Sequence, residues 1–225
     1  MRPIRSNHGF TLVELLVTLL VSGVVLAGIS STFYSQHTFY INQEQMVSMQ
    51  QNLRTAMYIM EREIRMAGHD PNGDSGSGIL AANSSSIRIA QDLIDDVGTE
   101  DNPDGDVNDP GEDITYSLQD GDGDGDTDLV RNDHNGAGFQ MIAENIDALN
   151  FVYLNQNHEV TTQPADMRSI QISVVARTGH PSRGYVNKTV YQNQRGQTIF
   201  IPLSGDQHRR RLLTAEVKCR NLGLE

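Results

Sequence analysis

The hydrophobic pattern begins with one unbroken apolar run, from Phe10 to Ile29, in which Glu14 is the only charged residue. A helix of that length covers roughly 30 Å, which is the thickness of the hydrocarbon core of a bilayer. Arg2 and Arg5 precede the run. Because basic residues stay on the cytoplasmic side, we expect a single membrane pass with the N-terminus inside and the rest exported.

Beyond the run, apolar residues recur at three- and four-residue steps, as on one face of an amphipathic helix. The stripe consists of Met46, Met49, Leu53, Met57, Met60, Ile64 and Ala67. Gly68 and Asp70-Pro71 then end the pattern. The sequence therefore predicts one helix over roughly residues 10–67, and its stripe either packs in a core or forms a methionine-rich groove for a partner.

The remainder alternates apolar and polar residues over short stretches, with no further helical pattern. Strands are predicted at 86–90, 114–118, 129–130, 148–154, 169–177, 185–191, 198–203 and 212–218. A helix followed only by strands favours an α+β fold in which a long N-terminal helix packs on an antiparallel β-sheet. The expected division is a leader at 1–9, a membrane helix at 10–29, its amphipathic continuation at 30–68 and an exported head at 70–225.

Net charge and cysteine content limit the kinds of partner and bond that this chain can have. The formal net charge is −12, which argues against nucleic acid as a partner and favours divalent cations. Cys219 is the only cysteine, so an internal disulfide is excluded, and its alternating apolar neighbours favour a small buried side chain over a reactive thiol.

Glu14 is the candidate functional residue of the apolar run. A charge at the centre of a membrane helix costs about 2.5–3.5 kcal/mol and marks a functional site by default. If the chain is cut after Gly9, Phe10 acquires an amino group one helical turn from Glu14. The corresponding amine of a neighbouring helix would supply the cation that a carboxylate in apolar surroundings requires.

The stretch Gly9-Phe10-Thr11-Leu12-Val13-Glu14-Leu15, behind a basic leader, resembles the signal of type IV pilins and type II secretion pseudopilins. The resemblance implies that a prepilin peptidase cuts after Gly9 and methylates Phe10, and that Glu14 aligns subunits in a helical filament with other major and minor pilins. It also implies an inner-membrane assembly platform as a partner and a final location on the cell surface. A cleaved secretory signal and a plain membrane anchor are the alternatives, although no A-x-A site follows the run.

Two further passages resemble PilW-type minor pilins: Met57 to Pro71, at the predicted helix end, and Arg209 to Asn221, near the C-terminus. The first also resembles J-type pseudopilins. The PilW resemblance implies a minor pilin that joins a type IV pilus and takes a place at its start or cap. The basic residues of the second passage either form a solvated strand edge or contact an acidic neighbouring subunit.

The acidic stretch 120–133 is the first candidate calcium loop. Asp120, Asp122, Asp124, Gly125 and Asp128 fall at positions 1, 3, 5, 6 and 9 of an EF-hand-like loop, with Asp126 between them. Arg131 takes the position of the closing glutamate, which excludes a complete EF-hand and leaves Asp133 to close the loop. A solvated hairpin tip without an ion is the alternative.

The stretch 100–113 repeats this spacing. Glu100, Asn102, Asp104, Gly105 and Asn108 fit the same loop positions, while Glu112 comes one residue after the closing position. A structural Ca²⁺ is the only cofactor expected for either loop.

No enzymatic activity is predicted. Gly73-Asp74-Ser75-Gly76 is similar to the nucleophile loop of chymotrypsin-like proteases, but such a triad needs a double-barrel scaffold that a long N-terminal helix does not fit. The function alternatives are therefore a minor pilin, a pseudopilin of a type II secretion system and a membrane-anchored calcium-binding adhesin. The adhesin would tolerate loss of Glu14.

Overall fold

The computed structural model describes residues 9–94, 103–134, 136 and 138–223. The chain divides into two compact units, Met1–Glu44 and Gln45–Glu225. A single helix, α1 (Leu12–Met66), supplies the described secondary structure of the first unit and continues into the second. All described strands belong to the second unit.

Within the second unit, α1 buries the stripe that its periodicity predicts. Met49, Leu53, Met57, Met60 and Ile64 are all buried. The helix ends where glycine permits it, because Gly68 has a positive φ of 79°, the left-handed conformation that favours glycine after a helix. A Cβ at Gly68 would also lie 2.6 Å from Leu222 Cδ2.

Two antiparallel sheets and one hairpin follow the helix. The first sheet has the order β1-β2-β3-β4-β5, with strands Gly78–Ala82, Ile87–Ala90, Asp113–Gln119, Asp128–Asn132 and Phe139–Ala143. The second has the order β10-β7-β6, with strands Arg210–Lys218, Ser169–Arg177 and Ile146–Leu154. Strands β8 (Tyr191–Gln192) and β9 (Thr198–Phe200) form the hairpin, and a short 3-10 helix, η1, covers Pro164–Asp166.

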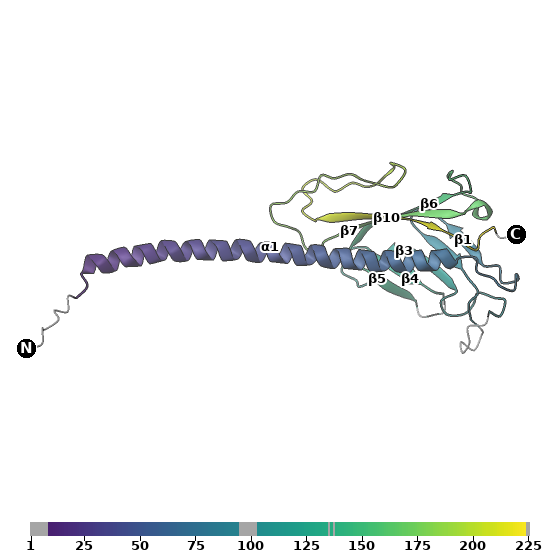
Figure 1. Cartoon of the computed structure of the whole chain (residues 1–225), viewed down its shortest axis with the longest axis horizontal. Coiled ribbons are helices and arrows are strands. Elements are labelled where there is room, and N and C mark those ends of the chain that lie inside the picture. The colour runs from purple at the N-terminus through teal and green to yellow at the C-terminus, as the bar shows by residue number, and fades with distance from the viewer. Residues whose placement is uncertain (1–8, 95–102, 135, 137, 224–225) are drawn as a thin grey trace, which may run out of the picture. The chain divides into compact units, whose positions relative to one another are not determined.

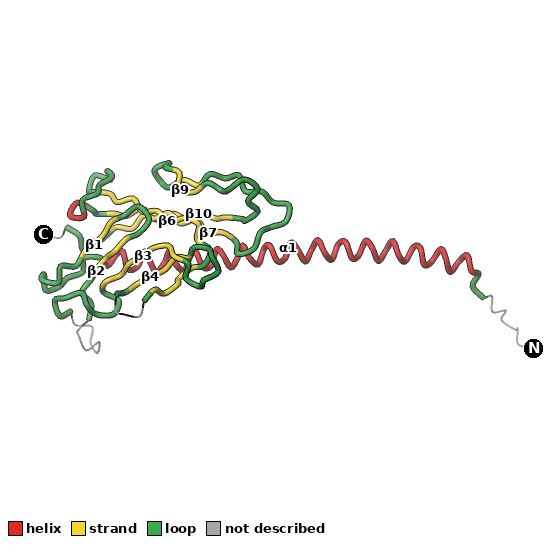
Figure 2. The backbone as a smooth tube through the Cα atoms, turned by 180° about the vertical axis from the view of Figure 1, so that it is seen from behind, coloured by secondary structure: helices red, strands yellow, loops and turns green. Residues whose placement is uncertain are grey.

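The main core lies between α1 and the two sheets. Figure 1 shows the helix in front of the strands, and Figure 2 shows the strands in front from the opposite side. The part of α1 that belongs to the second unit, residues 45–66, therefore covers one face of both sheets. The helix stripe packs with Ile87, Ile89, Ile114, Tyr116 and Leu129 of the first sheet and with Ile170, Ile172 and Val174 of the second. The predicted α+β class, a long helix on antiparallel strands, is confirmed.

Strand β7 is buried along almost its whole length because both of its faces are covered. Ile172 and Val174 face the main core, whereas Val175 joins a smaller cluster with Ala148 and Tyr191. Phe200 of the β8–β9 hairpin packs against this cluster. The run Ser169–Arg177 is therefore a central strand with apolar surroundings on each side.

Two strand predictions were too long, and two strands were missed. The predicted strand 185–191 contributes only Tyr191 to β8, because the side chain of Asn187 binds the Thr189 N–H and the His208 carbonyl and so holds a turn. The predicted strand 198–203 stops at Phe200, shortly before Pro202, which has no N–H for a ladder. Strands β1 and β5 were not predicted; β5 is an edge strand with mostly exposed residues, so it shows little alternation.

Candidate functional site

The predicted processing position lies in the segment before α1. The helix begins at Leu12, not at Phe10 as predicted, so the bond between Gly9 and Phe10 lies outside it. Phe10 is 87% exposed, and a Cβ on Gly9 would meet nothing within 4 Å. The bond therefore has the non-helical, open surroundings that cleavage of a chain terminus requires.

Glu14 and Thr11 form a reciprocal cap at the start of α1. The Thr11 N–H donates to Glu14 Oε2 over 3.0 Å, and the Glu14 N–H donates to Thr11 Oγ1 over 3.2 Å. The Thr11 hydroxyl also donates to Glu14 Oε2 over 3.1 Å. This is a capping box, in which two helix-start donors without intrahelical partners are satisfied by side chains. The Thr-x-x-Glu spacing of Thr11 and Glu14 is the sequence signature of this cap, a signal that the hydrophobic pattern alone does not reveal.

The apolar run presents a continuous hydrophobic surface. Its large apolar side chains are each 53–87% exposed in the single chain. The hydroxyl of Thr18 donates to the Glu14 carbonyl, and that of Thr32 donates to the Gly28 carbonyl, so these polar groups are turned onto the helix backbone. By length and composition α1 contains a segment apolar enough to cross a membrane. Such an all-round apolar surface requires lipid or other helices around it.

The candidate calcium residues of loop 120–133 separate into two groups. Asp126 pairs with Arg177, and Asp133 lies 3.4 Å from Arg131 Nη1. Asp128 is 1% exposed and accepts the Gly121 and Asn145 N–H groups, one on each oxygen. These three carboxylates are therefore engaged by the protein itself, and Arg131 binds Glu63 of α1 instead of a loop ligand.

Asp120, Asp122 and Asp124 form the second group, at the exposed tip between β3 and β4. One oxygen from each lies within 4.8 Å of the others. The Asp120 oxygens accept the N–H groups of Gly123 and Gly125, over 2.7 Å and 3.1 Å. Together with the bonds that Asp122 and Asp124 accept from backbone N–H groups, they stabilise the turn without an ion. Calcium at this tip stays a prediction.

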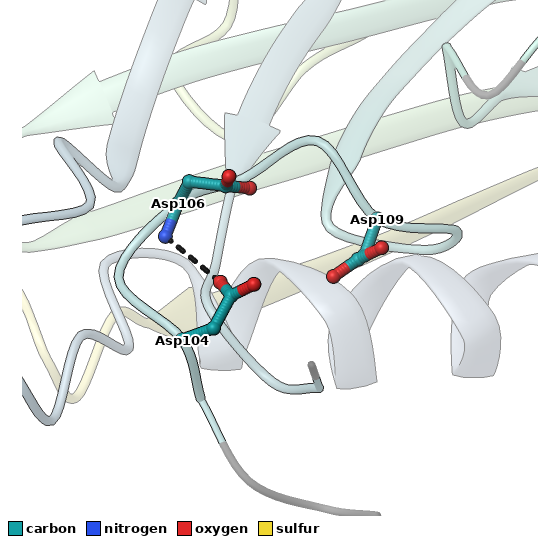
Figure 3. Close-up of side chains that lie close together, drawn as sticks. All are labelled: Asp104, Asp106 and Asp109. Atoms are coloured by element: carbon teal, nitrogen blue, oxygen red, sulfur yellow. Dashed lines mark hydrogen bonds between the residues drawn. The ribbon is translucent and has the colours of Figure 1, made fainter. Parts of the chain in front are cut away.

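The second acidic loop forms a different cluster from the predicted one. Glu100 and Asn102 lie outside the described residues. Asp104 gathers instead with Asp106 and Asp109, whose carboxylate oxygens approach within 4.8 Å of one another (Figure 3). The Asn108 N–H donates to Asp106 Oδ1 over 2.8 Å. The alternating acidic residues after Asp104 were a usable signal for Asp106, which the EF-hand comparison passed over.

Asp92 is a buried carboxylate beside this loop that sequence reasoning missed. It follows β2, is 0% exposed, and its Oδ2 accepts the Gly105 N–H over 3.1 Å. Its other oxygen, Oδ1, has no hydrogen-bond partner among the described residues. Burial raises the pKa of Asp92, and the carboxylates of Asp104 and Asp70 raise it further. No local pattern marks Asp92, because only the fold brings the two segments together.

Ser75 and Cys219, the two candidate nucleophiles of the sequence, lie in surroundings that do not activate them. The Ser75 hydroxyl accepts the Ser77 N–H, and the Ser75 N–H donates to Asp70. In the part of the chain that the structure describes, Ser75 therefore bonds within its own loop and not to a histidine. Cys219 is buried as predicted, and burial raises the pKa of its thiol to about 12, so the reactive thiolate is scarce at neutral pH.

Comparison with known proteins identifies the N-terminal segment. Residues 4–30 match the prokaryotic N-terminal methylation motif, so the chain carries this motif, with Gly9, Phe10 and Glu14 inside it. A type IV-like pilin from Thermus thermophilus is 15% identical with a TM-score of 0.48, over 77% of this chain and 97% of that chain. No curated protein sequence matches the chain.

Proposed function

We propose that this chain, which carries an N-terminal methylation motif, is a filament subunit of the type IV pilin kind and acts as a minor pilin of the PilW type. A prepilin peptidase removes residues 1–9 and methylates the new amine of Phe10. The apolar helix then holds the chain in the inner membrane with its N-terminus inside. An assembly platform moves it into a surface filament with other pilins, and there it initiates or caps the filament.

One observation carries this proposal: the apolar run is exposed on every side, yet it contains the carboxylate of Glu14 near its start. A plain anchor would account for the apolar surface but would leave Glu14 with no role beyond the cap of its own helix. A helical filament accounts for both, because its core surrounds the run with similar helices and brings in their amino groups. The methylation motif over residues 4–30 supports the same reading.

The capping box is compatible with a second contact for Glu14. The cap uses Oε2, and Oε1 makes no hydrogen bond to any residue that the structure describes. A helix N-terminus favours a carboxylate there before assembly. On assembly, the charged amine of a neighbour's Phe10 binds the same carboxylate, which offsets the cost of its transfer into the filament core.

The second unit serves as the surface-exposed head and has no catalytic role in this proposal. Ser75 bonds within its own loop and Cys219 is buried, as described above. The core between the helix and the sheets is filled by side chains of α1 and the strands. Head contacts with neighbouring subunits would then decide where in the filament the chain is placed.

A pseudopilin of a type II secretion system is the alternative within the same class, because its N-terminal signal is the same. Deletion of the gene separates the two functions. Loss of surface pili with normal protein secretion supports the minor pilin, whereas loss of secretion with normal pili supports the pseudopilin.

The experiment that tests filament entry uses Gly9→Val in the native cell, with filaments sheared from the surface and probed for the chain. We expect the variant to keep its leader, remain in the membrane fraction and be absent from filaments. Asn7→Ala is the matched control, because it alters the leader but leaves Gly9 and should behave as wild type. Entry of Gly9→Val into filaments at the wild-type level would overturn the proposal.

A further inference from the structure

Asp92 is the starting point, because it is a fully buried carboxylate with one oxygen that no described residue satisfies. Its N–H donates to the His69 carbonyl over 2.8 Å, which fixes the backbone beside the end of α1. Its Oδ2 accepts the Gly105 N–H, and its Oδ1 is buried without a hydrogen bond among the described residues. A buried polar atom in this state costs free energy unless a ligand or water satisfies it.

The groups around Asp92 are also acidic. Asp104 and Asp70 both act on it with like charge. Asp74 lies against the same turn, because a Cβ on Gly105 would fall 2.6 Å from Asp74 Oδ1. Within the described part of the chain, no lysine or arginine forms an ion pair with Asp92. Repulsion between carboxylates at short range is large in such surroundings, and a cation removes it.

The arrangement of the neighbouring loop fits a metal ion. Asp104, Asp106 and Asp109 turn their carboxylates toward a common region (Figure 3), with one oxygen of each within 4.8 Å of the others. Calcium binds oxygen at about 2.3–2.6 Å, so two ligands on opposite sides of one ion lie up to about 5 Å apart. Gly105, whose amide holds Asp92, stands between Asp104 and Asp106.

We propose that Asp104, Asp106 and Asp109 bind one Ca²⁺, with Asp92 as the buried carboxylate whose orphaned oxygen the ion or its bound water satisfies. This site replaces the EF-hand-like ligand set predicted for loop 100–113 and needs neither Glu100 nor Asn102. It is independent of filament entry. Magnesium is a poorer occupant, because it demands near-octahedral geometry and gives up water reluctantly.

The ion would connect three segments that are separate in the sequence: the loop after α1, the end of β2 and the loop 103–112. The loop after α1 meets the calcium loop directly, because the Asn72 side-chain amide donates to the Pro103 carbonyl over 3.0 Å. Asp92 meets both, through His69 and through Gly105. Bound calcium therefore stabilises the end of the head at which α1 terminates, as any ligand of the folded state does.

The test is hydrogen–deuterium exchange on the full chain in detergent micelles, with calcium, with magnesium and with chelator. With calcium at about ten times its dissociation constant, linkage predicts roughly tenfold slower exchange in residues 103–112. Asp106→Asn should abolish this slowing. Asp122→Asn, which alters the other acidic loop, is the matched control and should retain it.

Asp92→Asn gives a separate signature. It removes a buried charge, so the thermal midpoint in chelator should equal or exceed that of wild type, while the increase on adding calcium is lost. No slowing in 103–112 at calcium up to about 5 mM, a range that includes weak extracellular sites, would overturn the proposal. Equal slowing in wild type and Asp106→Asn would overturn it as well, and this outcome does not depend on whether Asp92→Asn folds.

Discussion

Arg131 Nε lies 3.1 Å from Glu63 Oε2, and this ion pair joins strand β4 to the buried face of helix α1. Tyr116 of β3 donates its hydroxyl to the same carboxylate. The side chains of Arg131 and Glu63 are only 12% and 9% exposed. Glu63, which lies beside the helix stripe, thus binds two strands of the first sheet. Its contact with Arg131 explains why an arginine stands after the acidic loop, at the position where an EF-hand has glutamate.

Removal of Glu63 should destabilise the head strongly. Glu63→Ala leaves the Tyr116 hydroxyl buried without its partner and leaves Arg131 with Asp133 alone. We therefore expect a loss of about 3 kcal/mol, the lower end for breaking a buried ion pair. The measurement is urea unfolding of the full chain in detergent micelles. Glu44→Ala, at an exposed position of the same helix, is the control, and a similar small loss in both variants would contradict this role of Glu63.

Asp206 should stabilise the fold only above acidic pH. The Arg210 guanidinium, 2.7 Å away, holds the pKa of the Asp206 carboxyl below its usual value. A lowered folded-state pKa gives stability that is present above the unfolded pKa, near 3.9, and is lost as pH falls through the folded pKa.

Asp206→Asn should therefore lower the free energy of unfolding by about 1.5 kcal/mol near neutral pH. This is the lower end of the range for a hydrogen bond to a charged group, because Arg210 still pairs with Asp147. The wild-type and Asp206→Asn unfolding free energies should converge near pH 2. The control Asp166→Asn, at an exposed site, should run parallel to wild type. A constant difference for Asp206→Asn at every pH would refute the electrostatic explanation.

Met60 should be a core residue rather than part of a partner groove. Its side chain is 0% exposed and lies in the core that α1 forms with the sheets. Met60→Ala should therefore cost about 2–5 kcal/mol of unfolding free energy. Tyr58, on the same helix turn, is 68% exposed, and Tyr58→Ala should cost much less. Equal losses in thermal or urea unfolding would show that the stripe does not pack as described.

Glu14 allows a separation of helix capping from subunit recognition. Glutamine can replace glutamate in a capping box, so Glu14→Gln should preserve the helix start, as read by the helical signal in micelles. It lacks the negative charge for a neighbour's amine, so the amount of chain in sheared filaments should fall at least about tenfold, as it should for Glu14→Ala. Full filament entry of Glu14→Gln together with failure of Glu14→Ala would assign Glu14 to capping alone.

Periodicity predicted the fold well where side chains face one core. The stripe from Met49 to Ile64 and the alternation in β3 and β6 specify which face packs in the main core, and the structure buries those faces. In β7 the alternation indicates only the face toward the main core, because its other face is buried as well. Strand β5 at a sheet edge and the segment 185–191, where Asn187 binds the backbone, lack such a constraint. Their structures depend on long-range partners that a local pattern does not record.

The candidate sites were less predictable. The methylation motif is a contiguous signal, so Gly9, Phe10 and Glu14 could be singled out directly. The acidic clusters depend on tertiary contacts. Arg177 forms an ion pair with Asp126, and the fold places Asp92, at the end of β2, where it accepts the Gly105 N–H. Spacing along the chain could suggest calcium but not which carboxylates remain for it.

The most direct measurement of the central claim is the mass of the N-terminal peptide of the chain recovered from sheared surface filaments. We predict a peptide that begins at Phe10 and carries one methyl group on its amino nitrogen. A chain that retains residues 1–9, or that begins at any other residue, would contradict it.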